Sequence, residues 1–588
     1  MFDANQNHPP EKTDAMVPTP VPPGSMTDRV VAWASGRLRG PAGEALIVGV
    51  GLVVAYLLLR MSPVVAIGAF RDDAIYVSLG KALAAHEGYR SIYAVGAPVH
   101  MKYPPGLPAI YAVLWWLGGT LSSVESLAKT LDLVVCGAAA SFIWWVGRAR
   151  LGLSTPLTLG FAISPFLLES SIQYFNLAIS EPYFLLGWAA ALALHYRLED
   201  AGPGRKRIGL SLALGLIVAA ATLIRSQALV LLPAFALALA MRRAGWRVLG
   251  AFAASASIPV AGWFWLHSRL VARGPVSLQP DEASYLTWLP WDRPVELLKS
   301  FASAAAWNWE AYWKIMPLNL SGSWVLGVVL CSGLLALAVG GGLRLVKRHP
   351  ALSLTTAANA TLIMLWPFPQ DRFLLPILPF AGLLVAAGAL WTGQRWRALT
   401  SRPALVLLAI LAAVIALRQV SIRRYAYSGE DPVATTGITY PSYYLASNTG
   451  YLAILSRWTL EHTSPDDRML VEFPAGLFLH TGRQGVASAP ADNQTAPIVF
   501  RTPGEFLTRR IVEDNITVIG LGNLQAQMAP EIALVQRSCP EALEFAGSAS
   551  PGALPVFFRV VRDDRCLAAL ARELRYGARG DAEDQSRQ

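Results

Sequence analysis

The segment ALIVGVGLVVAYLLLRMSPVVAIGAFRDDAIY, residues 45–76, joins a long apolar run to an abrupt group of charges. Its first part, roughly Ala45 to Val65, is about as long as a bilayer's hydrocarbon core is thick, which predicts a membrane-spanning helix. Asp72 and Asp73 stand where this helix would emerge into water. Because adjacent like charges are costly at a membrane boundary, we expect this pair to serve a function.

The whole chain has the composition of an integral membrane protein. Of its 588 residues, 54% are hydrophobic and 15% are charged, whereas soluble domains carry about 25% charged residues. Apolar runs of spanning length recur, so the sequence predicts an α-helical polytopic membrane protein with about 11 to 13 transmembrane helices. The net charge of +10 comes from short Lys and Arg clusters between these runs. Such clusters are typical of cytoplasmic loops and do not indicate nucleic-acid binding.

The basic clusters predict the topology. The Pro-rich residues 1–40 are expected to form a disordered cytoplasmic tail, and residues 41–421 a transmembrane domain with its first outer loop at 70–106. We expect the segment 104–118 not to cross, because a crossing there would place the basic cluster at Arg148 outside. The alternation of the remaining spans then ends with the C-terminus outside.

The composition becomes that of a soluble protein after about Ser421. Helical runs alternate with strand-like runs over residues 422–575, which predicts a small extracytoplasmic α/β domain, followed by a disordered tail at 576–588. The strands are expected in RMLVEF, ITVIGL and PVFFRVV. Cys539 and Cys566 lie in this domain, where export would allow a disulfide, although spacing alone leaves the pairing open.

Further charged side chains are expected at the same membrane face as the aspartate pair. Lys102 and Tyr103 precede two prolines that restrict the backbone, and a lysine suits a phosphate as a point charge. Arg225 and Arg372 interrupt apolar sequence, and a guanidinium forms bidentate bonds with phosphate oxygens. Glu181 begins a span and offers a second acidic group for an acceptor, a sugar or a divalent ion.

Each of these residues also has a structural alternative. The two aspartates could cap a surface helix, Lys102 could extend to the lipid interface, and Glu181 could cap a helix end. Arg372 could pair internally with Asp371, and Arg225 could contact a lipid headgroup.

The order of these motifs resembles that of the GT-C superfamily of integral membrane glycosyltransferases, in the branch of protein O-mannosyltransferases and the lipid A aminoarabinose transferase. The motifs are RDDAIY after the first span, KYPPGLP closing the first outer loop, NLAISE in the second outer loop and DRFLLPILP late in the membrane part. The resemblance covers roughly residues 45–400. It implies inverting sugar transfer from a polyprenyl-phosphate-linked donor on the outer face of the cell inner membrane.

The resemblance also implies roles for single residues. Asp72 matches the catalytic base of the first loop, and Asp73 takes the place of its neighbour, which is often a glutamate. Lys102 and Tyr103 match the element that lines the donor pocket, and Arg372 matches a basic residue near the donor phosphate.

Glu181 matches a position that is more often aspartate. Metal dependence varies across the superfamily, so no metal ligand is assigned and a divalent cation stays an open alternative. The implied partners are the lipid-linked donor, a lipid, glycan or protein acceptor, and membrane lipid. Two other classes remain as alternatives. A transporter or lipid flippase would place polar residues within its spans, and a non-catalytic scaffold would only display the α/β domain.

Overall fold

A computed structural model describes residues 40–58, 66–159, 166, 177–272, 290–321, 324–366, 371–395, 441–487, 506–522, 525–548 and 555–572. Residues 396–440, which include the end of the predicted transmembrane domain at 41–421, lie outside the described residues, as do residues 1–39 and 576–588 of the predicted tails.

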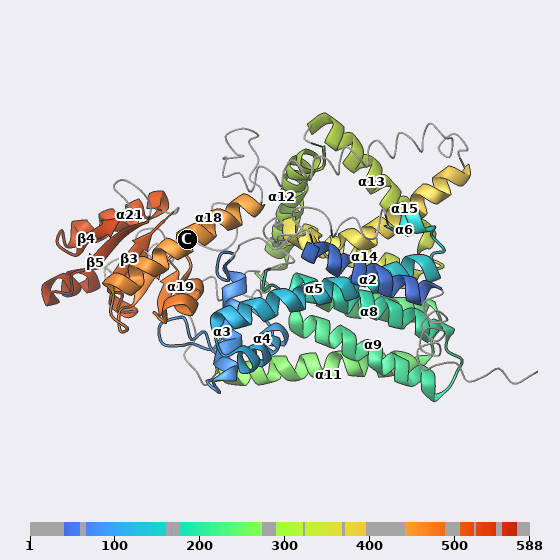
Figure 1. Ribbon diagram of the computed structural model, residues 1–588, viewed down its shortest axis with the longest axis horizontal. Helices are drawn as coiled ribbons and strands as arrows, with labels where there is room; N and C mark the ends of the chain where they lie inside the picture. Colours follow the sequence, from blue (N-terminus) through green and yellow to red (C-terminus); the bar gives the residue numbers. More distant parts are fainter. Residues whose placement is uncertain are drawn as a thin grey trace, which may run out of the picture.

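Helices make up most of the described chain before residue 396 (Figure 1). In hydrocarbon each backbone amide needs an internal hydrogen bond, and a helix supplies these bonds within one segment. Short 3-10 or π turns occur at η1 (Val146–Arg150), η4 (Ser226–Val230) and η7 (Asp371–Leu374). The α-helices are α2 (Pro41–Leu58), α3 (Asp72–Ala84), α4 (Gly106–Gly118), α5 (Leu121–Trp145), α6 (Thr155–Thr158), α8 (Glu181–Asp200), α9 (Arg205–Ile224), α10 (Leu231–Met241), α11 (Trp246–Val271), α12 (Pro294–Ser321), α13 (Trp324–Leu345), α14 (Pro350–Leu365) and α15 (Leu378–Arg395).

Four of the described helices are long and apolar enough to cross a membrane: Leu121–Arg150, Arg205–Ile224, Trp246–Val271 and Trp324–Leu345. This confirms the predicted class of an α-helical membrane protein, whereas the number of crossings stays a prediction. The 13-residue helix α4 spans about 20 Å, less than the roughly 30 Å of a bilayer core. That the 104–118 segment does not cross also stays a prediction.

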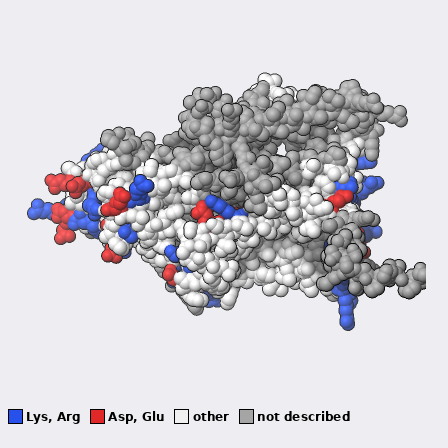
Figure 2. Space-filling model, in the orientation of Figure 1, with Lys and Arg blue, Asp and Glu red and all other residues white. Residues whose placement is uncertain are grey.

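Charged side chains gather at the two ends of the helices. Helix α8 begins at Glu181, ends at Asp200 and has 20 residues, a length of about 30 Å. At its far end Arg150 pairs with Asp200, and Arg242 pairs with Glu199 at 2.7 Å. Two of the basic clusters assigned to cytoplasmic loops therefore share one end of the molecule. On the face shown in Figure 2, the surface between the two ends is mostly uncharged.

The α/β domain, which comprises the described residues from 441 to 572, lies at the other end of the helices (Figure 1). Its sheet has the order β2-β1-β3-β5-β4, with β2, β1 and β3 parallel and β5 antiparallel to both β3 and β4. The elements are α18 (Pro441–His462), β1 (Met469–Val471), α19 (Pro474–Thr481), β2 (Gly485–Ala487), α20 (Phe506–Glu513), β3 (Val518–Leu521), α21 (Gln525–Ser538), β4 (Leu543–Ser548) and β5 (Val556–Val560).

The strands expected in RMLVEF, ITVIGL and PVFFRVV form as β1, β3 and β5. Strands β2 and β4 were not predicted, because β2 (Gly-Val-Ala) has a single β-branched residue between two small ones and β4 is interrupted by a register shift between Phe545 and Gly547. Cys539 and Cys566 form a disulfide with their Cα atoms 5.5 Å apart. This pairing is the one that the sequence left open.

Candidate active site

Asp72 is the first residue of α3 and lies at the centre of a buried group of charges. Its Oδ1 accepts a hydrogen bond of 2.5 Å from the Tyr103 hydroxyl. Its Oδ2 forms an ion pair of 2.6 Å with Nη2 of Arg372, which lies on η7. The side chains of Asp72 and Arg372 are 16% and 9% exposed. Three motifs that are far apart in the sequence therefore meet at one carboxylate.

The group continues from Arg372 to two further predicted residues. Arg372 Nε lies 3.5 Å from Glu181 Oε1. The same oxygen lies 3.0 Å from Arg225 Nη1, at an ion-pair distance but without the alignment of a hydrogen bond. Glu181 is fully buried. We refer to these residues, with Lys102, as the charge cluster: Asp72, Lys102, Tyr103, Glu181, Arg225 and Arg372.

Aromatic rings and a serine orient the two guanidinium groups. The ring of Phe373 lies 5.1 Å from Arg225 Cζ and 5.2 Å from Arg372 Cζ, and Phe70 lies 4.5 Å from Arg372 Cζ. Arg225 Nη1 also donates to Ser180 Oγ at 2.7 Å. Stacking against rings holds a guanidinium plane without consuming its hydrogen-bond donors. These residues were not predicted, although Phe70 lies two positions before Asp72 and Phe373 directly follows Arg372.

The charge cluster holds an excess of positive charge. It contains three cations, Lys102, Arg225 and Arg372, and two carboxylates, Asp72 and Glu181. Burial acts to raise the pKa of Asp72, but the charges of Arg372 and Lys102 and the Tyr103 hydrogen bond together lower it to about 2. Burial lowers the pKa of Arg372, but the charges of Asp72 and Glu181 outweigh it and raise that pKa above its ordinary value. Asp72 and Arg372 therefore stay ionised at neutral pH, and the surplus of cations over carboxylates in the cluster favours an added anion.

Tyr103 is held by hydrogen bonds to its backbone as well as by the prolines after it. Its amide donates to His100 Nε2 at 3.1 Å, and its carbonyl accepts from the Tyr89 hydroxyl at 2.8 Å. Because Nε2 accepts, Nδ1 of the neutral ring carries the proton and donates to Ser91 Oγ at 3.0 Å. Burial lowers the pKa of His100 to about 3, which keeps the ring neutral. His100 was not predicted, although it lies only two residues before Lys102.

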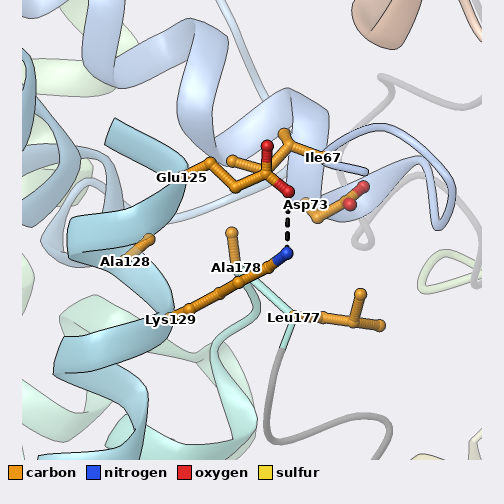
Figure 3. A pocket seen from close by; sticks show the side chains of 7 residues that line it. All are labelled: Ile67, Asp73, Glu125, Ala128, Lys129, Leu177 and Ala178. Carbon is orange, nitrogen blue, oxygen red and sulfur yellow. Dashed lines mark hydrogen bonds and ion pairs between the residues drawn. The ribbon is translucent and has the colours of Figure 1, made fainter. Parts of the chain in front are cut away.

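Asp73 forms its hydrogen bonds outside the charge cluster, and its assignment as a catalytic residue stays a prediction. Its Oδ2 accepts from the Gly68 amide at 2.8 Å and its Oδ1 from the Ala74 amide at 2.7 Å. It lines a separate pocket, where Lys129 and Glu125 form an ion pair of 2.8 Å (Figure 3). Successive helical residues point about 100° apart, so two adjacent acids at a helix start face different neighbours.

Within the described residues, no three His, Cys, Asp or Glu side chains come together to hold a metal ion. The Arg372 guanidinium bridges Asp72 and Glu181. The side chain of Asp371, the alternative partner of Arg372, lies outside the described part of the chain.

No protein-family model and no curated protein matches the chain. Among solved structures, it is similar to ArnT from Cupriavidus metallidurans bound to undecaprenyl phosphate, with 13% identity, 92% of this chain and 99% of that chain covered, and a TM-score of 0.49. It is also similar to the oligosaccharyltransferase AglB from Archaeoglobus fulgidus in complex with an inhibitory peptide and a dolichol-phosphate, with 11% identity, 92% and 75% covered, and a TM-score of 0.45.

A further structure of the Archaeoglobus fulgidus oligosaccharyltransferase, in complex with Zn and sulfate, is 12% identical, with 84% and 69% covered and a TM-score of 0.44. Both kinds of protein belong to the GT-C superfamily, the one that the sequence motifs resemble.

Proposed function

We propose that this protein is a membrane glycosyltransferase. It moves a sugar from a polyprenyl-phosphate-linked donor to an acceptor hydroxyl or phosphate on the extracytoplasmic face, with inversion at the anomeric carbon. The observation that supports this most is the charge cluster itself. Three cations and two carboxylates are gathered beside long apolar helices, at the end opposite the basic clusters.

The donor's chemistry matches the two sides of this site. A polyprenyl tail needs an apolar, lipid-facing surface, and its phosphate needs cations at the membrane boundary. Arg372 and Arg225 are oriented by ring stacking, and Lys102 Nζ lies 5.2 Å from the Tyr103 ring centroid. Preorganised cations of this kind stabilise the charge that develops on a leaving phosphate.

Asp72 is the proposed base. With a pKa of about 2, it is a weak proton acceptor while Arg372 holds it. A donor phosphate would compete for the same guanidinium, and its negative charge would raise the pKa of Asp72. Donor binding would therefore free the carboxylate and make it more basic at the moment when the acceptor has to lose its proton.

One observation favours the alternative of a transporter. Asp132 lies inside the long apolar helix α5 and is fully buried, with the Tyr183 hydroxyl of α8 as its polar neighbour. Ionisable residues within spans are typical of ion and proton pathways. The charge cluster, at the ends of helices and with a surplus of cations, has no role in that alternative.

The test is the variant Asp72→Asn, expressed in cells that lack this protein. Mass spectrometry of surface glycans and glycolipids should find a sugar modification that the wild type restores and Asp72→Asn does not. The matched control is Asp292→Asn, which changes an exposed aspartate and should restore the modification in full. Thermal unfolding checks that both variants are folded. Full restoration by Asp72→Asn would refute its role as the base, and absence of any modification with the wild type would refute the function.

A further inference from the structure

We propose that the α/β domain is a positioning element for Asp72, which it holds by clamping the turn that precedes α3. This turn, residues 67–72, is called here the Asp72 turn. The inference rests on the proposed function, because it assigns the domain a part in aiming the proposed base. Four features of the contact between the domain and this turn support it.

The backbone of the Asp72 turn has an unfavourable conformation next to the base. Arg71 has φ 67° and ψ −65°, and the Asp72 amide donates to the Phe70 carbonyl at 2.9 Å. These values are those of a γ-turn with positive φ, a rare and strained form for a residue with a side chain. Such a conformation persists only where surrounding contacts enforce it, and it is found preferentially at functional sites.

The α/β domain supplies contacts that enforce this conformation. Asn448 Nδ2 of α18 donates to the Ala69 carbonyl at 2.8 Å, and both residues are buried. His480 Nε2 of α19 donates to the Ile67 carbonyl at 3.0 Å. Two carbonyls of the turn, separated by one residue, are therefore bound by side chains from two different helices of the domain.

Arg71 itself is bound by the domain. Its Nε donates to the Glu472 carbonyl at 3.2 Å, and its guanidinium lies 5.9 Å from the Phe473 ring centroid. The residue with the strained backbone thus has its side chain attached to the loop between β1 and α19. Releasing that attachment would remove one of the contacts that keep φ of Arg71 positive.

Two glycines, one in the turn and one in α19, allow the domain and the turn to pack closely. A Cβ atom built on Gly68 would lie 2.8 Å from Gly476 Cα, and one built on Gly476 would lie 3.1 Å from Gly68 Cα. Any side chain at either position would push α19 and the turn apart. The Gly68 amide also donates to Asp73 Oδ2 at 2.8 Å, so Asp73 fixes the turn from within α3 while the domain contacts it from outside.

These contacts explain why Asp72 and Asp73 diverge as they do. The domain binds the backbone of the Asp72 turn at Ile67 and Ala69. Asp73 binds the Gly68 amide of the same turn. The Asp72 carboxylate faces Arg372 and Tyr103. A small rotation of the turn would move the Asp72 carboxylate away from both partners. Asn448 and His480 are therefore positioning residues, which act on the reaction through Asp72 without touching the substrate.

The test uses the full chain with two independent variants and one matched control. Gly476→Ala inserts a methyl group between α19 and Gly68, whereas Asn448→Leu removes the donor to Ala69 with little change in volume. The control is Gly450→Ala in α18, where a Cβ would meet nothing within 4 Å. Hydrogen exchange is measured on a peptide from the Asp72 turn and on a β3 peptide, together with sugar transfer and binding of undecaprenyl phosphate.

In both variants we expect faster amide exchange in the Asp72 turn by about tenfold, with unchanged exchange in β3. The turnover number should fall by about tenfold, less than the hundredfold loss that a misplacement of about 1 Å can cause, with nearly unchanged binding of undecaprenyl phosphate. Gly450→Ala should behave as wild type in every measurement.

Unchanged exchange in the turn for both variants would overturn the clamp. Faster exchange with a normal turnover number would overturn its role in positioning Asp72. Loss of protection in the β3 peptide would show that a variant has failed to fold. In that case the exchange and turnover results of the other variant test the clamp. Hydrogen exchange is measured without substrate, so it tests the clamp independently of sugar transfer. A wild type that transfers no sugar would refute the proposed function and leave the exchange result valid.

Discussion

Asp72 and Arg372 are 300 residues apart in the sequence, and their side chains form an ion pair of 2.6 Å. A buried carboxylate and a buried guanidinium stabilise the fold only together, because removal of either one leaves the other uncompensated. The pair therefore ties η7 to the first turn of α3. It also occupies the guanidinium that we propose for the donor phosphate, so its structural and chemical roles must be separated by experiment.

Arg372→Ala should leave Asp72 and Glu181 without their shared counter-charge. We expect the free energy of unfolding to fall by about 3 kcal/mol and undecaprenyl phosphate to bind more weakly. Chemical unfolding and lipid titration in detergent measure the two effects. Arg372→Lys is the control for charge, because its single nitrogen cannot serve Asp72 and Glu181 as the guanidinium does. It should bind lipid with intermediate affinity. If Arg372→Ala lowers the free energy of unfolding but leaves the affinity for undecaprenyl phosphate unchanged, Arg372 stabilises the fold and does not bind the donor phosphate.

Glu181→Gln should increase the affinity of the charge cluster for anions. The change removes one of two carboxylates and leaves three cations, so undecaprenyl phosphate should bind about tenfold more tightly, and more so at low salt. The matched control is Glu296→Gln, since Glu296 forms an exposed ion pair with Arg293 and should not alter binding. Equal affinities for Glu181→Gln and wild type would contradict anion binding at this cluster.

Tyr103→Phe should raise the pKa of Asp72, because the hydroxyl donates to Asp72 Oδ1 at 2.5 Å and lowers that pKa. A base must be deprotonated to act, so the acid limb of kcat/KM should move upward from about pH 2 towards 3.8, the ordinary pKa of aspartate. The maximal rate should nevertheless fall by about tenfold, because the Asp72 carboxylate loses the hydrogen bond that orients it. An unmoved acid limb would show that the hydroxyl does not act on the base.

His100→Ala should disturb the same contact indirectly, because Tyr103's backbone amide would lose its acceptor. We expect a lower kcat with little change in KM for the donor. His100→Gln offers a side-chain oxygen near the position of Nε2 and should recover most of the activity. Equal losses in the two variants would indicate that the ring is needed for packing rather than for positioning Tyr103.

Asp73 should make stability depend on pH. Burial raises its pKa to about 7 from an ordinary value of 3.8, despite hydrogen bonds from the Gly68 and Ala74 amides. The folded protein then holds the proton up to about pH 7, whereas the unfolded chain releases it near 3.8. This contribution to stability is fully present below about pH 4 and is lost as the pH rises to 7. Thermal unfolding between pH 4 and 8 should show a downward slope that Asp73→Asn removes; the same slope in both proteins would contradict the raised pKa.

The sequence could predict much of the fold because the signals that specify it are local. Apolar runs of membrane thickness predict helices, since hydrocarbon allows no other spanning segment without a closed barrel. In the α/β domain, β1, β3 and β5 were predicted from runs of apolar and β-branched residues, whereas β2, with the residues Gly-Val-Ala, lacks such a run. The candidate residues Asp72, Tyr103, Glu181, Arg225 and Arg372 were recognised because a charge or polar ring beside an apolar run is unusual.

The amino-acid sequence alone thus determined the membrane class, the helices, the strands with clear patterns and the residues with costly charges, because each depends on neighbours along the chain. Only the tertiary structure decided that Asp72 rather than Asp73 faces Arg372, that His100 holds Tyr103, and that α18 and α19 hold the Asp72 turn. Those outcomes depend on the direction of a side chain and on contacts between distant segments, which hydropathy and spacing do not encode.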